Sequence, residues 1–129
     1  MKKLLLLIVL LLVVFSLTSC SVVNVEYTGL RVGCVHSEND GEIKLSCMKF
    51  NGGVNYTVNV KEDKNLYFDS LFTVKNGTVA LQIIGTNGEA LYSETITSDS
   101  TFRFDLKEYG KNKIKLEFTE FEGEYSFKW

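Results

Sequence analysis

The sequence predicts an all-β chain, a single antiparallel β-sandwich of the jelly-roll or immunoglobulin type with about eight or nine short strands. From Val22 onward apolar residues alternate with polar ones, and no stretch has the spacing of an amphipathic helix. Turn signals separate these runs about every ten residues. The 9 Phe and 6 Tyr residues lie mostly on the apolar phase, which indicates an aromatic core.

The alternating runs give the expected strands in order. They are Ile43 to Cys47, Val54 to Val60, Val79 to Ile83, Phe102 to Leu106, Ile114 to Phe118 and Tyr125 to Trp129. The turn signals between them are Asp40-Gly41, Asn51-Gly52-Gly53, Asn76-Gly77, Asn87-Gly88, Gly110 to Asn112 and the region of Gly123. We prefer a sandwich to a barrel, because short strands can pair into two sheets whose inner faces share one core about 10 Å thick.

The N-terminal segment has the order of a secretory signal. Lys2 and Lys3 precede an apolar run that starts at Leu4, and small or hydroxylated residues follow from Ser16. The run ends at Leu17 and is too short for a helix that spans about 30 Å of hydrocarbon. We therefore expect residues 1–19 to be a signal peptide and residues 20–129 to be one sandwich domain with a short N-terminal tether.

The last residues of this segment, Leu17-Thr18-Ser19-Cys20, resemble the lipobox of bacterial lipoproteins. The resemblance implies cleavage after Ser19 and a diacylglycerol on the Cys20 sulfur. Two acyl chains hold a protein stably on a membrane. It thus implies a lipid anchor at Cys20 on the extracytoplasmic face of the cell membrane. Plain secretion, with Cys20 merely near the cleavage site, is the alternative.

Two cysteines remain, in a compartment where disulfides persist. Asp40-Gly41 favours a two-residue hairpin turn, and a hairpin centred there places Cys34 opposite Cys47 at a non-hydrogen-bonded position. The Cα atoms of such pairs lie about 4.5 Å apart, within the range of a disulfide. We predict a Cys34–Cys47 bridge. Two free buried thiols, or a longer loop that breaks the register, are the alternatives.

Charge and motif content argue against several function classes. The formal charge is -2 from 14 basic and 16 acidic residues, or 12 against 16 (-4) once Lys2 and Lys3 are removed. No basic cluster suggests nucleic acid as a partner. Cys34, Cys47 and His36 do not complete a zinc site, and no glycine-rich phosphate loop is present. We expect no cofactor and no metal, although a loop calcium site using Asp40 or Asp63 stays open.

Catalytic groupings are equally sparse. The only histidine, His36, would have to serve alone as a base, and its simplest interpretation is a strand residue beside Leu45. Four acids crowd near the C-terminus, as a glycosidase would require: Glu117, Glu120, Glu122 and Glu124. Cross-strand pairing with Lys113 and Lys115 explains them better, so we expect no catalytic residues and no enzyme.

The C-terminal half, Asn76 to Trp129, combines Gly77-x-Val79-x-Leu81 with a final Gly123-x-Tyr125-x-Phe127-x-Trp129 strand. This pattern is similar to small β-sandwich surface lipoproteins of bacteria, and the resemblance implies a fold and no activity.

The leading hypothesis is a noncatalytic surface domain that binds a protein or an envelope glycan. The alternatives are an accessory or inhibitor subunit, which would expose an apolar patch on an envelope enzyme or transporter, and a small hydrolase, which would need a cleft with convergent acids. Four aromatic residues could form an exposed binding platform, or pack in the core as their alternating runs favour: Tyr56, Tyr67, Tyr92 and Trp129.

Overall fold

The computed structural model describes residues 2–3, 20–39, 41–61, 66–106 and 109–129. Its elements are β1 (Cys20–Val32), β2 (Val35–Asn39), β3 (Glu42–Val60), β4 (Leu66–Ile84), β5 (Ala90–Ile96), β6 (Ser100–Leu106) and β7 (Gly110–Lys128). Among these described residues, no helix is long and apolar enough to cross a membrane. The all-β class is confirmed.

All seven strands belong to one antiparallel sheet, in the order β1-β3-β7-β4-β5. β2 also pairs with β3, beyond the end of β1, and β6 also pairs with β4, beyond the end of β5. β1 and β2 therefore occupy the place of one long strand with an interruption, beside β3. β5 and β6 do the same beside β4. These two interrupted strands flank three continuous ones, β3, β4 and β7.

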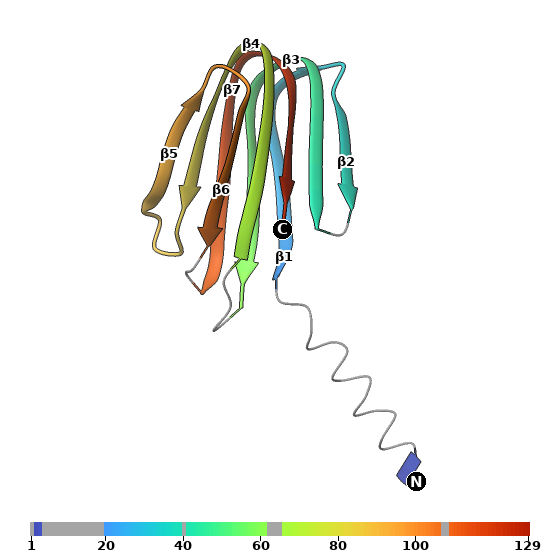
Figure 1. Cartoon of the computed structure of the whole chain (residues 1–129), viewed down its shortest axis with the longest axis vertical. Coiled ribbons are helices and arrows are strands. Elements are labelled where there is room, and N and C mark those ends of the chain that lie inside the picture. The colour runs from blue at the N-terminus through green and yellow to red at the C-terminus, as the bar shows by residue number, and fades with distance from the viewer. Residues whose placement is uncertain (1, 4–19, 40, 62–65, 107–108) are drawn as a thin grey trace.

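This sheet is folded across its middle, and its two halves face one another (Figure 1). Half A contains β2, residues 42–47 of β3, 123–128 of β7, 66–74 of β4, and β6. Half B contains β1, residues 52–60 of β3, 110–118 of β7, 78–84 of β4, and β5. The result is the predicted antiparallel sandwich, in which three strands contribute to both layers.

We call the line across the sheet at which β3, β4 and β7 bend the fold line. It explains why the structure describes seven strands rather than the eight or nine short ones expected. Asn51-Gly52-Gly53, Asn76-Gly77 and Gly123 were expected to be turns, but they lie inside β3, β4 and β7. The ladders shift register there and continue. Gly77 shows the physical reason: it has φ +78°, and a Cβ on it would lie against the carbonyl oxygens of Thr119 and Glu120. Glycine thus lets two strands bend together at close approach.

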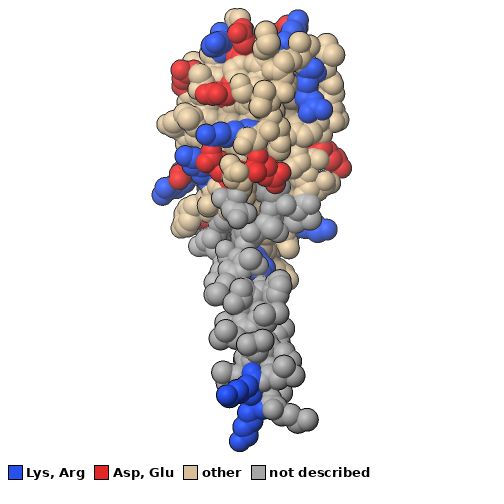
Figure 2. Space-filling model, turned by 90° about the vertical axis from the view of Figure 1, so that its right-hand side faces the viewer, with Lys and Arg blue, Asp and Glu red and all other residues tan. Residues whose placement is uncertain are grey.

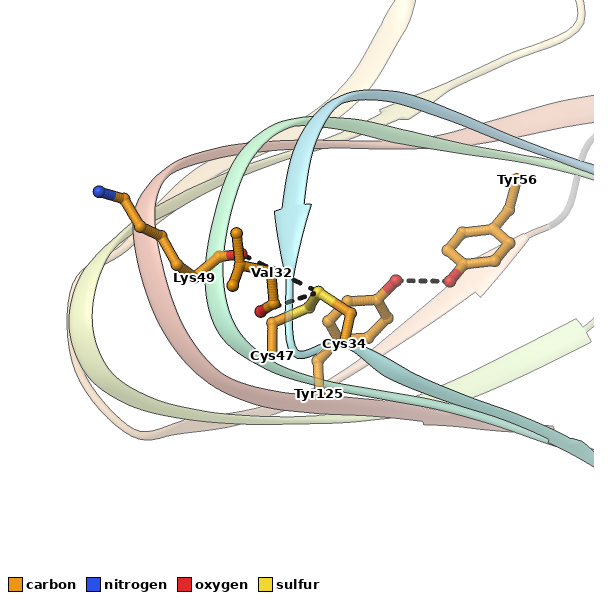
Figure 3. Close-up of a disulfide and its surroundings, with 6 residues drawn as sticks. All are labelled: Val32, Cys34, Cys47, Lys49, Tyr56 and Tyr125. Carbon is orange, nitrogen blue, oxygen red and sulfur yellow. Dashed lines mark hydrogen bonds between the residues drawn. A yellow bond between two sulfur atoms is a disulfide. The ribbon is translucent and has the colours of Figure 1, made fainter.

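The core fills the space between the halves and is rich in aromatic rings. Phe72, for example, lies with its ring centroid 5.7 Å from that of Tyr125 and 5.9 Å from that of Phe127. Tyr56 of half B and Tyr125 of half A, each 1% exposed, join their hydroxyls in a hydrogen bond across the core. Figure 3 shows the two hydroxyls pointing at one another. The expected aromatic core is confirmed.

The Cys34–Cys47 disulfide is confirmed, with a Cα–Cα distance of 4.1 Å (Figure 3). The hairpin register is also the predicted one, since Asn39 pairs with Glu42 and Val35 with Ser46. Asp40 itself lies outside the described residues. The bridge links the edge segment between β1 and β2 to the buried Cys47 of β3.

The stretch after Cys20 pairs with β3 instead of forming a separate tether. Cys20 is the first residue of β1 and is the partner of Val60. Val60 in turn pairs with Gly110. Cys20 therefore lies in the end row of half B, at the end of the strands opposite the fold line.

Candidate functional site

The outer face of half A is hollowed at two adjoining places. Alternation along each strand directs one set of side chains into the core and the other to this face. On β4, Phe68 and Phe72 are buried, whereas Asp69 and Leu71 point outward. On β7, Tyr125 and Phe127 are buried and the residues between and beside them form the outer set. The face is built on five paired strands and is therefore rigid.

Two adjoining hollows cross this face, and we call them together the groove. The first, of about 390 Å³, lies over β4, β6 and β7 and is lined by Asp69, Ser70, Leu71, Thr101, Phe102, Arg103, Ser126 and Lys128. The second, of about 290 Å³, lies over β2, β3, β4 and β7 and is lined by Val35, Ser37, Lys44, Leu45, Ser46, Leu71, Glu124, Tyr125, Ser126 and Lys128. Leu71, Ser126 and Lys128 line both. At about 4.8 Å per strand step, the face is about 19 Å wide from β2 to β6.

Within the described part of the chain, four of the five charged residues that line the groove have an ion-pair partner, and the exception is Glu124. Arg103 donates from Nε and Nη2 to the two Asp69 carboxylate oxygens, at 2.7 and 3.2 Å. Glu42 lies 3.0 Å from the Lys44 ammonium and 3.9 Å from that of Lys128. The bonded Arg103 guanidinium holds the pKa of Asp69 below its usual range, and the Lys128 charge lowers it further. The groove thus offers fixed donors and acceptors with little net charge.

Apolar groups complete the face. Leu71 is 46% exposed, Val35 is 69% exposed, and Tyr67 is 52% exposed on the outward phase of β4, close enough to influence the Arg103 charge. An exposed aromatic ring with a polar tip, beside paired charges and hydroxyls, is suited to a ligand that presents both CH surfaces and hydroxyl groups.

Of the four aromatic candidates from the sequence, only Tyr67 lies on this face. Tyr56 is buried, and Trp129 packs on the core with its centroid 5.5 Å from Phe68. Tyr92 is 37% exposed on β5 in half B, with its ring centroid 6.3 Å from that of Phe102. Core packing was thus the correct prediction for Tyr56 and Trp129 and the wrong one for Tyr67.

No protein-family model matches the chain, and no curated protein sequence matches it. Among solved structures it is similar to a family 4 carbohydrate-binding module, with TM-score 0.43 and 13% identity over 78% of this chain and 76% of that one. It is also similar to a family 29 carbohydrate-binding module, with TM-score 0.44 and 16% identity over 79% and 74% of the two chains. At these TM-scores the likeness carries no argument about the groove or its ligand.

Of the residues considered for catalysis, Glu124 lines the second hollow of the groove, and the others lie apart from it. His36 projects at the β2 edge and meets the Tyr27 ring edge-on at 5.9 Å between centroids. The expected pairing of the C-terminal acids with Lys113 and Lys115 is wrong, because all of them lie on β7. Glu120 instead pairs with Lys49 of β3 at 3.0 Å.

Glu120 lies at the fold line and has φ 49°, a conformation that is unusual for a residue with a side chain. Asn51 stabilises it, because its side-chain oxygen accepts from the Glu120 N–H at 2.7 Å and its amide donates to the Glu120 carboxylate at 3.1 Å. Lys49 and Asn51 together hold the pKa of Glu120 below its usual range. These contacts explain the acid as a stabiliser of the bend.

No group of three His, Cys, Asp or Glu side chains could hold a metal ion within the ranges that the structure describes. Cys34 and Cys47 are joined to each other and offer no thiolate. Asp40 and Asp63, the residues considered for calcium, lie outside those ranges, as does the lipobox segment that precedes Cys20. The lipid anchor remains a prediction.

Alternation in the sequence assigned most outward residues correctly but could not locate the groove. Ser126, Lys128 and Asp69 all occupy polar phases of their runs. Equivalent polar residues occur on the outer face of half B. Where hollows form on these faces depends on how side chains from five strands fill the space, and alternation within single strands does not report it.

Proposed function

We propose that the chain is a noncatalytic binding domain, anchored to the membrane through Cys20, that holds a glycan of the cell envelope in the groove of half A. The groove carries the proposal. It crosses several strands and combines an exposed leucine, hydroxyl groups and paired charges, and the exposed Tyr67 lies outside the two hollows on the same face. A sugar chain presents apolar CH faces and hydroxyl edges to these same kinds of group.

The arrangement of charge supports a binding role over a catalytic one. Asp69 is engaged in both its oxygens by Arg103, so it is stabilised as an anion and is a poor proton donor. His36 lines neither hollow of the groove. The paired side chains can still donate to and accept from ligand hydroxyls with their remaining atoms.

The test is binding of purified peptidoglycan sacculi and of a panel of soluble neutral and anionic polysaccharides, measured by co-sedimentation and titration calorimetry. Replacing Leu71 of the groove together with Tyr67 of the same face, Tyr67→Ala with Leu71→Ala, should weaken binding at least about tenfold, since each lost apolar contact contributes about 1 kcal/mol. The matched control is Leu91→Ala with Tyr109→Ala, two side chains of similar exposure outside the groove.

Loss of binding in the groove variant alone supports the proposal. No binding to any glycan by the wild-type protein, or equal losses in both variants, overturns the groove as the site. The anchor is tested separately, by the intact mass of protein from the membrane fraction. A lipid mass on the wild type that is absent from Cys20→Ala supports it, and a soluble wild type without lipid refutes it.

A role as an accessory or inhibitor subunit is favoured by a different observation. Four large apolar side chains are exposed around the junction of β1 and β2: Leu30, Val32, Val35 and Met48, between 48 and 71% exposed. A photo-crosslinking residue at Met48 should then give one discrete protein adduct in intact envelopes, and the same residue at Thr95 of half B should give none. Adducts at neither position would remove this candidate.

A further inference from the structure

The outer face of half B carries a row of lysines on its central strand. Lys111, Lys113 and Lys115 alternate with buried residues on β7, so all three ammonium groups project from the same face. Alternate residues of a strand are about 6.7 Å apart, which makes the row about 13 Å long. We call these three residues the lysine row.

The neighbours of the lysine row are almost all uncharged. Lys111 pairs with Asn59, and Lys113 lies between Thr57 and Ile84 in the sheet. None of the three lysines forms an ion pair with another residue that the structure describes. The row therefore differs from the groove of half A, where Arg103, Lys44 and Lys128 each have a carboxylate partner.

Lys113 and Lys115 of the row line a cavity on this face. The cavity, of about 200 Å³, lies between the two lysines, with Asn55, Thr57 and Ile84 on its walls and Glu26 of β1 at its side. Ammonium, amide and hydroxyl groups are donors suited to phosphate oxygens. Among the described residues of this face, Glu26 and the more distant Glu117 are the acids, so the three lysines give this part of the face a net positive charge.

The position of Cys20 indicates which anionic partner lies close to the lysine row. Cys20 is next to Val60, and Val60 is next to Gly110, in the end row of half B. Two strand steps of about 4.8 Å place Cys20 about 10 Å from the start of the lysine row. By contrast, the β1–β2 side of the molecule has acidic and basic side chains interspersed (Figure 2).

We propose that the lysine row binds anionic phospholipid headgroups, so that half B lies against the membrane and the groove of half A faces away from it. This inference rests on the proposed anchor at Cys20, which keeps the row near the membrane surface. The inference specifies how the domain is oriented on the membrane. The groove faces ligands that lie away from the bilayer, and the lysine row is covered by the lipid surface.

The experiment uses the mature chain purified from membranes and reconstituted into vesicles of phosphatidylcholine, with or without phosphatidylglycerol. Trace acetylation followed by mass spectrometry reports the reactivity of each lysine. With phosphatidylglycerol at low salt, Lys113 and Lys115 should react about tenfold more slowly than in phosphatidylcholine, and Lys49 should not change. The protection should vanish near 1 M salt, where the Debye length is about 3 Å.

Replacing Lys113 and Lys115 by glutamine should lower the docking constant about 30-fold, because each lysine near an anionic surface contributes about 1 kcal/mol. Lys111 then loses its protection. The charge-matched control, Arg31→Gln with Lys49→Gln, removes two cations from elsewhere and should leave Lys111 protected. Equal reactivity in both kinds of vesicle, or protection that needs no anionic lipid, overturns the proposal.

Failure of the anchor gives a different result from failure of the lysine row. If the intact mass shows no lipid, the unmodified chain is floated with the same vesicles, and recovery with phosphatidylglycerol vesicles alone still supports the row. Protection of the row by soluble polyphosphate, without any by phosphatidylglycerol vesicles, would assign the row to an anionic polymer and overturn membrane docking.

Discussion

Replacing either Tyr56 or Tyr125 by phenylalanine should lower the free energy of unfolding clearly, whereas replacing both should lower it only slightly. Each hydroxyl is buried and has the other as its hydrogen-bond partner across the core. A single substitution leaves one buried hydroxyl without that hydrogen-bond partner, which costs about 1–3 kcal/mol. When both hydroxyls are removed, neither is left buried and unpaired, so this cost does not arise. The sum of the two single costs should therefore exceed the double cost by about 2 kcal/mol or more.

The two single variants should also differ from one another. The Tyr27 hydroxyl is buried near Tyr56 and makes no hydrogen bond of normal geometry. In Tyr125→Phe the Tyr56 hydroxyl can turn to Tyr27, but in Tyr56→Phe the Tyr125 hydroxyl has no such substitute. We expect Tyr56→Phe to be the more costly substitution.

Urea unfolding of the four proteins at neutral pH, followed by near-ultraviolet circular dichroism, gives the required free energies. Tyr109→Phe is the control, since that side chain is 65% exposed and its hydroxyl is free to bond water. If the double variant lost as much free energy of unfolding as the two single variants together, the two hydroxyls would not depend on each other. The reasoning from the hydrogen bond would then be refuted.

Three further results are expected. Burial raises the pKa of Tyr56 and of Tyr125, so the stability that they contribute is complete below their unfolded pKa near 10 and is lost as the pH rises above it; urea titrations between pH 9 and 11 should show this fall, and the double phenylalanine variant should show a smaller one. Reduction of Cys34–Cys47, whose sequence separation is 13, should lower the free energy of unfolding by about 3 kcal/mol, and an unchanged urea midpoint would contradict the loop-entropy argument. Gly77→Ala should cost at least about 2 kcal/mol more than Gly88→Ala, because both glycines have positive φ but only Gly77 is enclosed by backbone; equal melting temperatures would contradict this.

The Cys34–Cys47 hairpin could be predicted because a two-residue turn fixes the register of the strands beside it, and register then fixes which side chains meet. The Asn51-Gly52-Gly53 segment was misassigned for a related reason. Glycine with positive φ permits a chain reversal or a bend within a strand. The choice depends on whether the partner strands, here at Gly29 and Glu120, bend at the same level. That information lies far away in the sequence.

The groove was harder to predict than the fold. Leu71 breaks the polar phase of β4 with an exposed apolar side chain, and Tyr67 occupies the same phase. Both could have marked an unusual outer face. Their relation to Arg103 and Ser126, however, arises only from the strand order β7-β4-β6, which brings together segments more than thirty residues apart.

The pairing of β1 has a mechanical consequence for a chain held at Cys20. A pull on Cys20 along β1 acts parallel to the strand and perpendicular to its hydrogen bonds with β3, which therefore share the load in shear instead of opening one after another. If β1 nevertheless slid free, the covalent link from Cys34 to Cys47 would transfer the load to β3, one of the three strands that run through both halves. Tension at that end is thus passed into the centre of the sheet, and the edge strand is not peeled away.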